Sequence, residues 1–372
     1  MRERAIVVGA GPGGLACAAV LQREGMRVEV VERGDGVGAN WRSRYDGLRL
    51  NTVRWLSQLP GYRMRRSVGR WVGRDDYVDY LERYRSRHQI EVTTNAEMLD
   101  LRRGIGGWTV RTTKGELEAA VVVIASGAFD RPVVPPWPGL DRYGGDFRHV
   151  ARYRNADRYH DRHVLVVGGG ASGLEIASQL ADAGARRVDL SVRTGVHLFP
   201  RQLGGYPLTP HPASRFLPRR TLDTAGALLQ KVLPGDWPSP LPRPPMALGA
   251  GLAEGIEPVV ADGVVAALRA GRIDLVAAVS AFDSNEVRLA DGTVIRPDAV
   301  IAATGYRSRL DQTVAELGIL DRTGNPARGD GGADRRVPGL IFVGFHSALT
   351  GRLPQFPNQA RRAAATARVV LR

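Results

Sequence analysis

A glycine-rich loop near the start of the chain has the composition to hold a phosphorylated ligand. Residues Gly9–Gly14 follow the spacing G-x-G-x-x-G, directly after an apolar run of strand type and directly before a helical pattern. In such a unit the first glycine allows a tight turn, the second lets a pyrophosphate approach the backbone, and the third lets the helix pack on the strand. We therefore expect a dinucleotide at this loop, held by Gly9, Gly11, Pro12, Gly13 and Gly14.

An acidic residue completes this unit. Glu32 ends the second predicted strand, residues 27–31, and lies roughly 20 residues past the loop, where a carboxylate accepts hydrogen bonds from ribose hydroxyls. Arg33, Trp41 and Arg42 are further candidates for contact with the same cofactor, although packing in the core explains Trp41 equally well. The acid predicts a nucleotide with a free ribose, such as FAD.

The opening pattern repeats in the middle of the chain. Residues 163–167 form an apolar run, Gly168–Gly173 again fits G-x-G-x-x-G, and a helical pattern follows. The second strand of this repeat ends in Arg193-Thr194 rather than in an acid, and an arginine pairs with the 2′-phosphate that a carboxylate would repel. The repeat therefore predicts a second cofactor, NADPH, held by Gly168, Gly170, Ser172, Gly173, Arg193 and Thr194.

Composition narrows the class of protein. The 372 residues are 43% hydrophobic and 24% charged, which is ordinary for a globular chain with two cores. The formal charge is +14, but arginine is spread along the chain without an evident dense basic block, so we expect no nucleic-acid partner. Cys17 is the only cysteine, which excludes an intramolecular disulfide and a Cys-x-x-Cys redox centre.

Two further patterns bear on location and metal binding. No apolar run approaches the roughly 20 residues needed to span a bilayer, so we expect a cytoplasmic protein without a membrane span. No Cys/His cluster has metal-ligand spacing, so we expect no metal.

Other segments have readable periodicity. Residues 75–87 have helical spacing with tyrosines on one face, which indicates helix packing. Residues 91–101 predict a strand, and residues 108–113 and 116–124 a hairpin-like pair. Further strands are expected at 48–52, 276–282, 286–289, 294–296, 298–303 and 340–343, and a final helix at 359–370.

Two proline-rich segments punctuate the chain. Residues 131–139 can be neither regular helix nor central strand, so we expect them to cross between domains. Residues 204–245 have little periodicity, which is typical of a functional loop or mobile cover. We expect residues 1–150 and 297–372 to form an FAD-binding domain and residues 151–296 an NADPH-binding domain.

In chain order, several motifs resemble those of class B flavin-dependent monooxygenases, closest to the flavin-containing (FMO-type) and YUCCA-like branch. The two glycine loops match that family's FAD and NADPH loops, and residues 303–306 are its A-T-G-Y linker. Residues 143–153 resemble the fingerprint F-x-G-x-x-x-H-x-x-x-(W/Y/F), with Tyr143 in place of phenylalanine and His149 as its histidine. Residues 193–201 and 48–52 also resemble segments of that family.

The resemblance implies an α/β fold of glutathione-reductase type, with two Rossmann-like dinucleotide-binding domains and the NADPH domain inserted in the FAD domain. It places Asn51, from the family's L-x-L-N-T, beside the flavin, and an amide can donate and accept hydrogen bonds there without titrating. Asn51 is therefore our candidate catalytic residue, with a hydrogen bond inside a turn as the alternative. The resemblance adds His149, Thr304, Gly305 and Tyr306 to the expected cofactor contacts, although His149 is equally compatible with a structural cap.

The implied reaction uses NADPH, FAD and O2. Reduced flavin and O2 give a flavin hydroperoxide, which oxygenates a nucleophilic nitrogen, sulfur or activated carbon of a small molecule. Baeyer–Villiger oxidation of a ketone is the alternative, and Tyr153, without a Trp-Pro or Trp-Asp ending, disfavours it.

Two other classes share this architecture. A disulfide reductase would need a cysteine pair, which the chain lacks. A nucleotide-sensing protein without turnover is disfavoured by the intact motifs. Dimers are common among similar enzymes, so a homodimer is an expectation.

Overall fold

The chain folds into two compact units, seen here in a computed structural model. The structure describes residues 4–203, 205–208, 221, 224, 241–253, 256–261, 263–346 and 350–371. The first unit contains Met1–Arg44, Leu48–Arg131 and Tyr306–Arg372, and the second contains Tyr45–Gly47 and Pro132–Gly305. The second unit is thus inserted in the sequence of the first.

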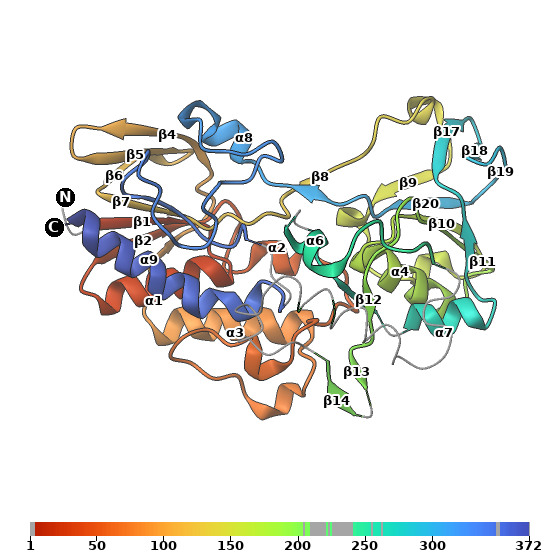
Figure 1. Cartoon of the computed structure of the whole chain (residues 1–372), viewed down its shortest axis with the longest axis horizontal. Helices are drawn as coiled ribbons and strands as arrows, with labels where there is room; N and C mark the ends of the chain where they lie inside the picture. Colours follow the sequence, from red (N-terminus) through yellow and green to blue (C-terminus); the bar gives the residue numbers. More distant parts are fainter. Residues whose placement is uncertain are drawn as a thin grey trace. The chain divides into compact units, whose positions relative to one another are not determined.

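The first unit is built on a parallel five-stranded sheet with the order β22-β7-β1-β2-β3 (Figure 1). Its strands are β1 (Arg4–Val8), β2 (Arg27–Val31), β3 (Val92–Thr93), β7 (Val121–Ile124) and β22 (Leu340–Phe342). Helix α1 (Pro12–Arg23) connects β1 to β2, as the glycine loop predicts. Because the strands are parallel, their carboxyl ends meet at one edge, where ligands bind in such sheets.

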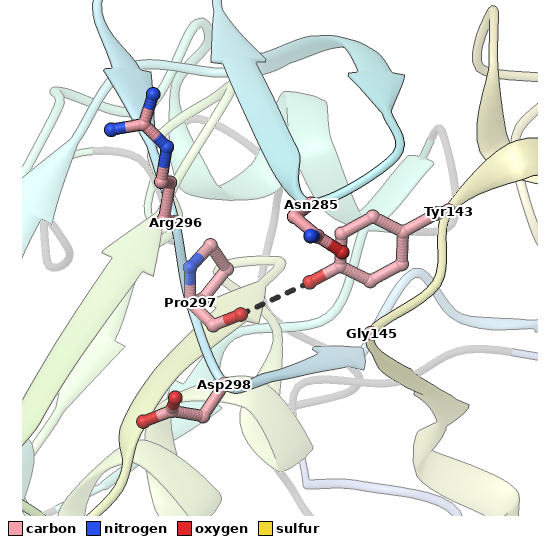
Figure 2. Close-up of a pocket in the computed structure, with 6 residues that line it drawn as sticks. All are labelled: Tyr143, Gly145, Asn285, Arg296, Pro297 and Asp298. Carbon is pink, nitrogen blue, oxygen red and sulfur yellow. Dashed lines mark hydrogen bonds between the residues drawn. The ribbon is translucent and has the colours of Figure 1, made fainter.

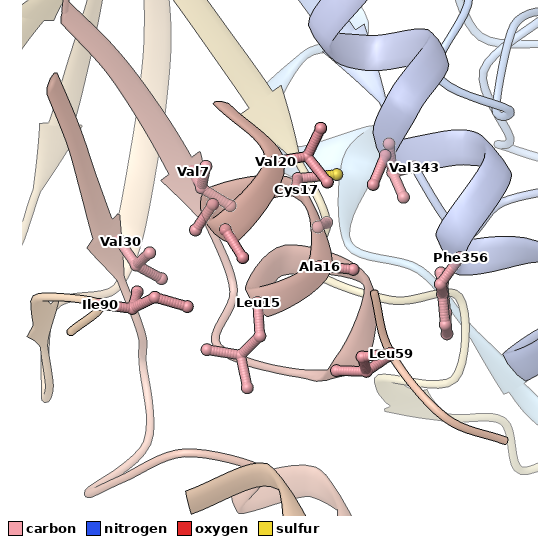
Figure 3. Close-up of a cluster of buried hydrophobic side chains, with 14 of the residues drawn as sticks. Val7, Leu15, Ala16, Cys17, Val20, Val30, Leu59, Ile90, Val343 and Phe356 are labelled. Carbon is pink, nitrogen blue, oxygen red and sulfur yellow. The ribbon is translucent and has the colours of Figure 1, made fainter. Parts of the chain in front are cut away.

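Alternate residues of β1 face two separate cores. Val7 lies in the core formed with helices α1, α3 (Arg74–Arg87) and α9 (Phe356–Leu371), and Figure 3 shows this core around α1. Ile6 and Val8 instead pack toward the antiparallel strands β4 (Met98–Gly104) and β5 (Gly107–Thr112). The predicted packing stripe on α3 is confirmed, since its buried residues are Tyr77, Tyr80, Leu81 and Tyr84.

The second unit repeats this plan with the strand order β16-β11-β10-β20-β9, again parallel. Its strands are β9 (Asp146–His149), β10 (His163–Val167), β11 (Arg187–Ser191), β16 (Asp274–Val276) and β20 (Ala299–Ala302). Helices α4 (Ala171–Asp182) and α7 (Gly263–Arg269) pack together, and α4 contacts β10 and β11. A second core joins Leu165 and Val300 to the antiparallel strands β17 (Val279–Asp283), β18 (Glu286–Leu289) and β19 (Val294–Ile295).

The other elements are short. They are α2 (Ala39–Arg42), α6 (Leu248–Ala253), α8 (Leu310–Thr313), β6 (Gly115–Ala119), β8 (Arg131–Pro132), β12 (Leu198–Phe199), β13 (Gln202–Leu203), β14 (Tyr206–Pro207), β15 (Val259–Val260), β21 (Tyr306–Arg307) and the 3-10 helices η1 (Arg54–Leu56), η2 (Arg66–Val68), η3 (Leu140–Arg142), η4 (Val150–Arg152), η5 (Asp157–Tyr159), η7 (Ala315–Leu317) and η8 (Leu353–Gln355). Within the described ranges, no helix combines the length and apolar character that a membrane crossing requires.

The predicted α/β class with two parallel dinucleotide-binding sheets is confirmed, but four predicted strands are wrong in detail. Residues 116–124 form two strands, because β6 pairs antiparallel with β5 whereas β7 joins the parallel sheet. Residues 91–101 form two strands because Asn95 has a φ of +52°, which ends extended backbone. Residues 276–282 are divided because β16 joins the parallel sheet whereas β17 pairs antiparallel with β18. Residues 48–52 contain only an isolated bridge between Arg49 and Gly73.

Two expectations concern segment boundaries. Residues 132–150 and 297–305, which we assigned to the first domain, fall in the second unit, where β9 pairs with β20 and Asp146 lies opposite Ala299. The loop expected at 204–245 lies largely outside the described residues.

Candidate functional site

The first glycine loop forms a cradle whose three glycines have distinct geometric constraints. Gly9 has a φ of +104°, and a Cβ there would lie 2.7 Å from the carbonyl oxygen of Ala125. A Cβ on Gly14 would lie 1.8 Å from the carbonyl oxygen of Gly9, so the helix can approach the strand only without a side chain. A Cβ on Gly11 would meet nothing within 4 Å. The open space beside Gly11, in front of the first amides of α1, fits a pyrophosphate.

The predicted ribose acceptor Glu32 also fixes this loop. Its Oε2 accepts the N–H of Ala10 at 2.7 Å, and its Oε1 accepts the N–H of Gly34 at 2.8 Å. A carboxylate has about four lone-pair sites, so both oxygens keep capacity for ribose hydroxyls. Glu32 therefore has a structural role that its spacing did not indicate.

Arg33 has a protein partner. Its guanidinium donates to both carboxylate oxygens of Asp130, at 2.6 and 3.0 Å. Arg309 also bonds Asp130, at 3.1 Å, and reaches Glu97 at 3.1 Å. The hydrogen bond with Asp130 raises the pKa of Arg33. The group joins chain segments that leave and re-enter the first unit, and sequence reasoning missed Asp130 because its partners are distant in the chain.

Trp41 and Arg42 lie on α2, close to the same loop. The ring of Trp41 makes an edge contact with Tyr77, with centroids 4.8 Å apart, so packing accounts for part of its role. Arg42 donates to the carbonyl oxygen of Val37 at 2.7 Å and pairs with Asp35 at 3.2 Å.

Asn51 lies in a bend and is exposed. The next residue, Thr52, is buried, and its hydroxyl lies 2.6 Å from that of Ser57. This hydrogen bond fixes the bend from inside, so the Asn51 side chain projects from an anchored backbone. That placement suits a residue that contacts a ligand.

Two further loops meet at the carboxyl edge of the first sheet, and none of their residues was among the predicted cofactor contacts. Gly344 follows β22, and its N–H donates to Oε1 of Gln359 at 2.9 Å. Arg352 donates to the carbonyl oxygen of Gly344 at 2.7 Å, and its guanidinium lies 4.6 Å from the ring centre of Phe129, after β7. A glycine directly after a buried strand was the available signal for this loop.

The second glycine loop reproduces the first cradle. Gly168 has a φ of +127°, and a Cβ there would lie 2.3 Å from the carbonyl oxygen of Ala303. A Cβ on Gly173 would lie 1.9 Å from the carbonyl oxygen of Gly168, whereas one on Gly170 would meet nothing within 4 Å. Ser172 lies in the first turn of α4. The same open space therefore faces the start of α4 and fits a second pyrophosphate.

The end of β11 carries the expected positive charge. Arg193 and Thr194 follow this strand and are both exposed. Glu32 directly follows β2, whereas Val192 directly follows β11 and Arg193 comes next. The two cradles thus share their backbone geometry and differ in the charged residues that follow the second strand.

The side chains of His149 and of Thr304 in the A-T-G-Y segment form hydrogen bonds with backbone groups. The N–H of Ala151 donates to Nδ1 of His149 at 3.1 Å, which leaves the proton on Nε2 to donate to the carbonyl oxygen of Gly305 at 3.1 Å. Thr304 donates to the carbonyl oxygen of Val133. These bonds give His149 and Thr304 a structural role in the second unit.

Tyr306 belongs to the first unit. The Arg44 guanidinium lies 4.5 Å from its ring centre. Burial raises the pKa of Tyr306, with Arg44 opposing the shift.

Sequence reasoning also missed Glu175 on α4. The hydroxyl of Tyr45 donates to its Oε2 at 2.7 Å, and the Tyr45 ring lies 6.0 Å from that of Tyr153. A carboxylate shortly after the second glycine loop was the available signal.

A surface hollow of about 270 Å³ lies elsewhere in the second unit (Figure 2). Its lining residues are Tyr143, Gly145, Asn285, Arg296, Pro297 and Asp298. The Tyr143 hydroxyl donates to the carbonyl oxygen of Pro297 at 3.1 Å, and burial raises the pKa of Tyr143 to about 12. None of the expected cofactor contacts lines this hollow. Across the described part of the chain, no three acidic, histidine or cysteine side chains are grouped to hold a metal.

Comparison with known proteins gives the same assignment as the cradles. Residues 6–215 match the family described as pyridine nucleotide-disulphide oxidoreductase. The chain is 34% identical over 362 residues to the indole-3-pyruvate monooxygenase YUCCA8 of rice (Oryza sativa subsp. indica), covering 91% of this chain and 85% of that protein.

Solved structures show the same fold. A flavin-containing monooxygenase from Stenotrophomonas maltophilia superimposes with a TM-score of 0.76 at 20% identity, covering 98% of each chain. A cyclohexanone monooxygenase superimposes with a TM-score of 0.72 at 19% identity, covering 98% of this chain and 86% of that one.

The single cysteine separates this chain from the disulfide chemistry in the family's description. Cys17 is buried in α1, and burial raises the pKa of its thiol to about 12. The two cradles, the motif order and the relatives agree on one assignment: the chain belongs to the class B flavin-dependent monooxygenases, in the flavin-containing and YUCCA-like branch, and is an oxidoreductase that uses FAD, NADPH and O2.

Proposed function

We propose that the first unit holds FAD over Gly9–Gly14 and Glu32, and that the second holds NADPH over Gly168–Gly173. One observation carries this assignment: the cradles have matching geometry, but the acid Glu32 follows the second strand of the first cradle, whereas Val192 and Arg193 follow that of the second. A guanidinium binds a 2′-phosphate by charge-assisted hydrogen bonds, whereas a carboxylate repels it.

In the proposed reaction the cofactor supplies the redox chemistry, and the protein binds and orients the reactants. The bound flavin supplies hydride acceptance and oxygen transfer. The amides at the starts of α1 and α4 hold the pyrophosphates. The amide of Asn51 would orient the reacting oxygen by donating and accepting hydrogen bonds.

We propose a small nucleophilic substrate that is oxygenated at nitrogen, sulfur or activated carbon. The rice relative is named for indole-3-pyruvate, a 2-oxo acid whose enol form has a nucleophilic carbon, so a compound of this kind is the first candidate. Oxidation of a ketone is the alternative, and the fold likeness to cyclohexanone monooxygenase is compatible with it.

The deciding experiment compares NADPH consumption with product and hydrogen peroxide, using indole-3-pyruvate, a thioether, a tertiary amine and cyclohexanone. Asn51→Ala should retain FAD, continue to consume NADPH and release hydrogen peroxide in place of product. Asn285→Ala, an exposed turn residue, is the control. Unchanged coupling in Asn51→Ala contradicts the role of this residue, and a lactone from cyclohexanone alone favours the alternative.

Arg193→Glu tests the NADPH assignment. We expect KM for NADPH to rise about 10- to 100-fold with little change for NADH. Arg288→Glu makes the same charge change at another exposed position of the second unit and should leave both values unaltered. Equal effects of the two substitutions would refute a specific contact with the 2′-phosphate.

We also propose a cytoplasmic homodimer, since similar enzymes are commonly dimeric. Light scattering of the purified protein tests the dimer, and a monomer mass across micromolar concentrations would refute it. Cell fractionation tests the location.

A further inference from the structure

One segment of the first unit concentrates positive charge. Residues 48–74 contain seven arginines and no aspartate or glutamate, so they carry half of the formal charge of +14. The sequence reasoning that described arginine as spread along the chain was wrong for this segment. The seven residues are Arg49, Arg54, Arg63, Arg65, Arg66, Arg70 and Arg74.

The fold gathers these arginines in space. The two ends of the segment run side by side, because the N–H of Leu50 donates to the carbonyl oxygen of Val72 at 2.9 Å and that of Arg54 donates to the carbonyl oxygen of Arg70 at 2.9 Å. The Arg54 side chain reaches the carbonyl oxygen of Met64 at 3.1 Å, which brings the middle of the segment to the same place. The segment lies between α2 and α3 in the chain (Figure 1).

Apolar side chains anchor the segment from below. These buried residues alternate with the arginines along the chain and are Leu50, Val53, Leu59, Met64 and Val72. The arginine side chains therefore project outward, and Arg49, Arg63, Arg65, Arg66 and Arg70 are exposed. We call these five residues the arginine surface.

Local acids do not neutralise its centre. Arg63, Arg65 and Arg66 make no ion pair with any residue that the structure describes. The nearest acids in the sequence begin at Asp75, which pairs with Arg74 at 2.7 Å. Guanidinium groups held close together without counter-charges favour a partner that presents many phosphates.

We propose that the arginine surface binds the anionic headgroups of a phospholipid membrane, so that the enzyme attaches peripherally. Trp55 lies on the same segment with half of its surface exposed (50%), and tryptophan is favoured at the level of lipid headgroups. Clustered arginines next to an anionic bilayer gain favourable energy that adds over the residues.

The observations favour lipid over nucleic acid. Before Arg74, which begins α3, the segment contains only the 3-10 turns η1 and η2, so the arginine surface offers no α-helix or strand pair to enter a DNA groove. Trp55 is its one large aromatic that is highly exposed among the described residues, whereas single-stranded nucleic acids bind to rows of aromatic rings. This inference does not depend on the substrate or on the cofactor assignment.

The test is co-sedimentation of the FAD-loaded protein with vesicles at low salt. We expect binding to vesicles of phosphatidylcholine with phosphatidylglycerol, little binding to phosphatidylcholine alone, and release at high salt. The variant Arg63→Glu/Arg65→Glu/Arg66→Glu should partition at least about 100-fold less. Bound flavin and far-ultraviolet circular dichroism report whether the variant folds.

A matched variant controls for net charge. Arg103→Glu/Arg322→Glu/Arg361→Glu changes the charge equally at exposed positions outside the segment and should keep vesicle binding. Trp55→Ala is a second test of the same surface that leaves the arginines unchanged, and it should weaken vesicle binding about tenfold. Three outcomes would overturn the proposal: no binding to anionic vesicles, equal losses in the two triple variants, or tighter binding to oligonucleotides than to vesicles.

Discussion

The carboxylate of Glu32 accepts the backbone N–H of Ala10 at 2.7 Å, across 22 positions of sequence. The acid that was expected to bind a ribose therefore also holds the middle of the glycine loop in place. Its other oxygen accepts the N–H of Gly34 at 2.8 Å. Under the proposed cofactor assignment, FAD affinity and loop stability therefore depend on the same side chain.

Glu32→Gln should weaken both properties. A glutamine presents one acceptor oxygen and one NH2 group, so either Ala10 or Gly34 loses its acceptor. We expect FAD to bind about 10- to 100-fold more weakly, and the apoprotein to lose about 1–2 kcal/mol of unfolding free energy. FAD titration and urea unfolding measure these changes. Glu24→Gln, which alters a surface pair with Arg368, is the control. An unaltered FAD affinity would contradict the role of Glu32.

Alanine substitutions at the glycines should separate folding from binding. Gly11→Ala adds a methyl group into open space, so the apoprotein should fold normally and lose FAD affinity. Gly14→Ala places Cβ 1.8 Å from the carbonyl oxygen of Gly9, so the protein should be unstable or insoluble. Thermal unfolding of the apoproteins and their flavin content give the comparison. A Gly11→Ala protein with full FAD affinity would show that no phosphate approaches there.

The same pair exists in the second unit. Gly170→Ala should keep FAD and raise KM for NADPH, whereas Gly173→Ala should destabilise the protein, because its Cβ would lie 1.9 Å from the carbonyl oxygen of Gly168. Loss of FAD from a folded Gly170→Ala protein would contradict the separate assignment of the two cofactors.

Tyr77→Phe should stabilise the protein. The Tyr77 hydroxyl is buried and has no hydrogen-bond partner among the described residues. An unsatisfied buried hydroxyl costs about 1–3 kcal/mol, so its removal should raise the urea midpoint of the apoprotein. Tyr84→Phe is the matched control on the same helix, because its hydroxyl donates to the carbonyl oxygen of Pro60 at 2.8 Å and its loss should destabilise. A lower midpoint for Tyr77→Phe would mean that the hydroxyl has a partner, such as a bound water.

Asp189 should give the second unit an acid-dependent stability. It is fully buried, and it accepts hydrogen bonds from His163 at 2.7 Å and Arg187 at 2.9 Å. Burial opposes ionisation, but these two partners outweigh it and lower the pKa of Asp189. Its stabilisation is therefore present above the carboxyl's unfolded pKa of about 3.9 and is lost as pH falls through the lower folded value.

Asp189→Asn should lose about 2 kcal/mol of unfolding free energy at pH 7, and its difference from the wild type should shrink below about pH 4. Urea unfolding at several pH values measures both effects. Asp274→Asn, at a half-exposed partner of Arg187, should have a small effect. A difference that stays constant down to pH 3 would exclude the titration of Asp189 as its cause.

Local constraints made much of the fold predictable. Gly14 and Gly173 were identified from spacing, because each lies against the carbonyl oxygen of the glycine five residues earlier in the chain. The tyrosines of α3 were identified from helical periodicity. Distant pairings were not predictable in this way. The pairing of Asp146 with Ala299, which places β9 in the second sheet, joins residues that share no local pattern.

The residues of the candidate site also divide into those that local sequence could indicate and those that depend on distant contacts. Residues whose proposed roles depend on local spacing in the sequence, such as Gly11 and Arg193, could be proposed from the sequence. The hydrogen bond of Gln359 to Gly344 and the ion pair of Arg33 with Asp130 depend on where separate loops meet at the sheet edge. Only the three-dimensional structure contains that information.

The buried position of Cys17 has a practical consequence. Because the only thiol of the chain lies inside α1 and remains protonated at neutral pH, maleimide dyes should not react with the native protein. Cysteines introduced at the exposed positions Ser86 and Ser284, one in each unit, would then be the sole sites of labelling. Energy transfer between a donor dye and an acceptor dye at these positions would then report the distance between the two units while NADPH binds and is released.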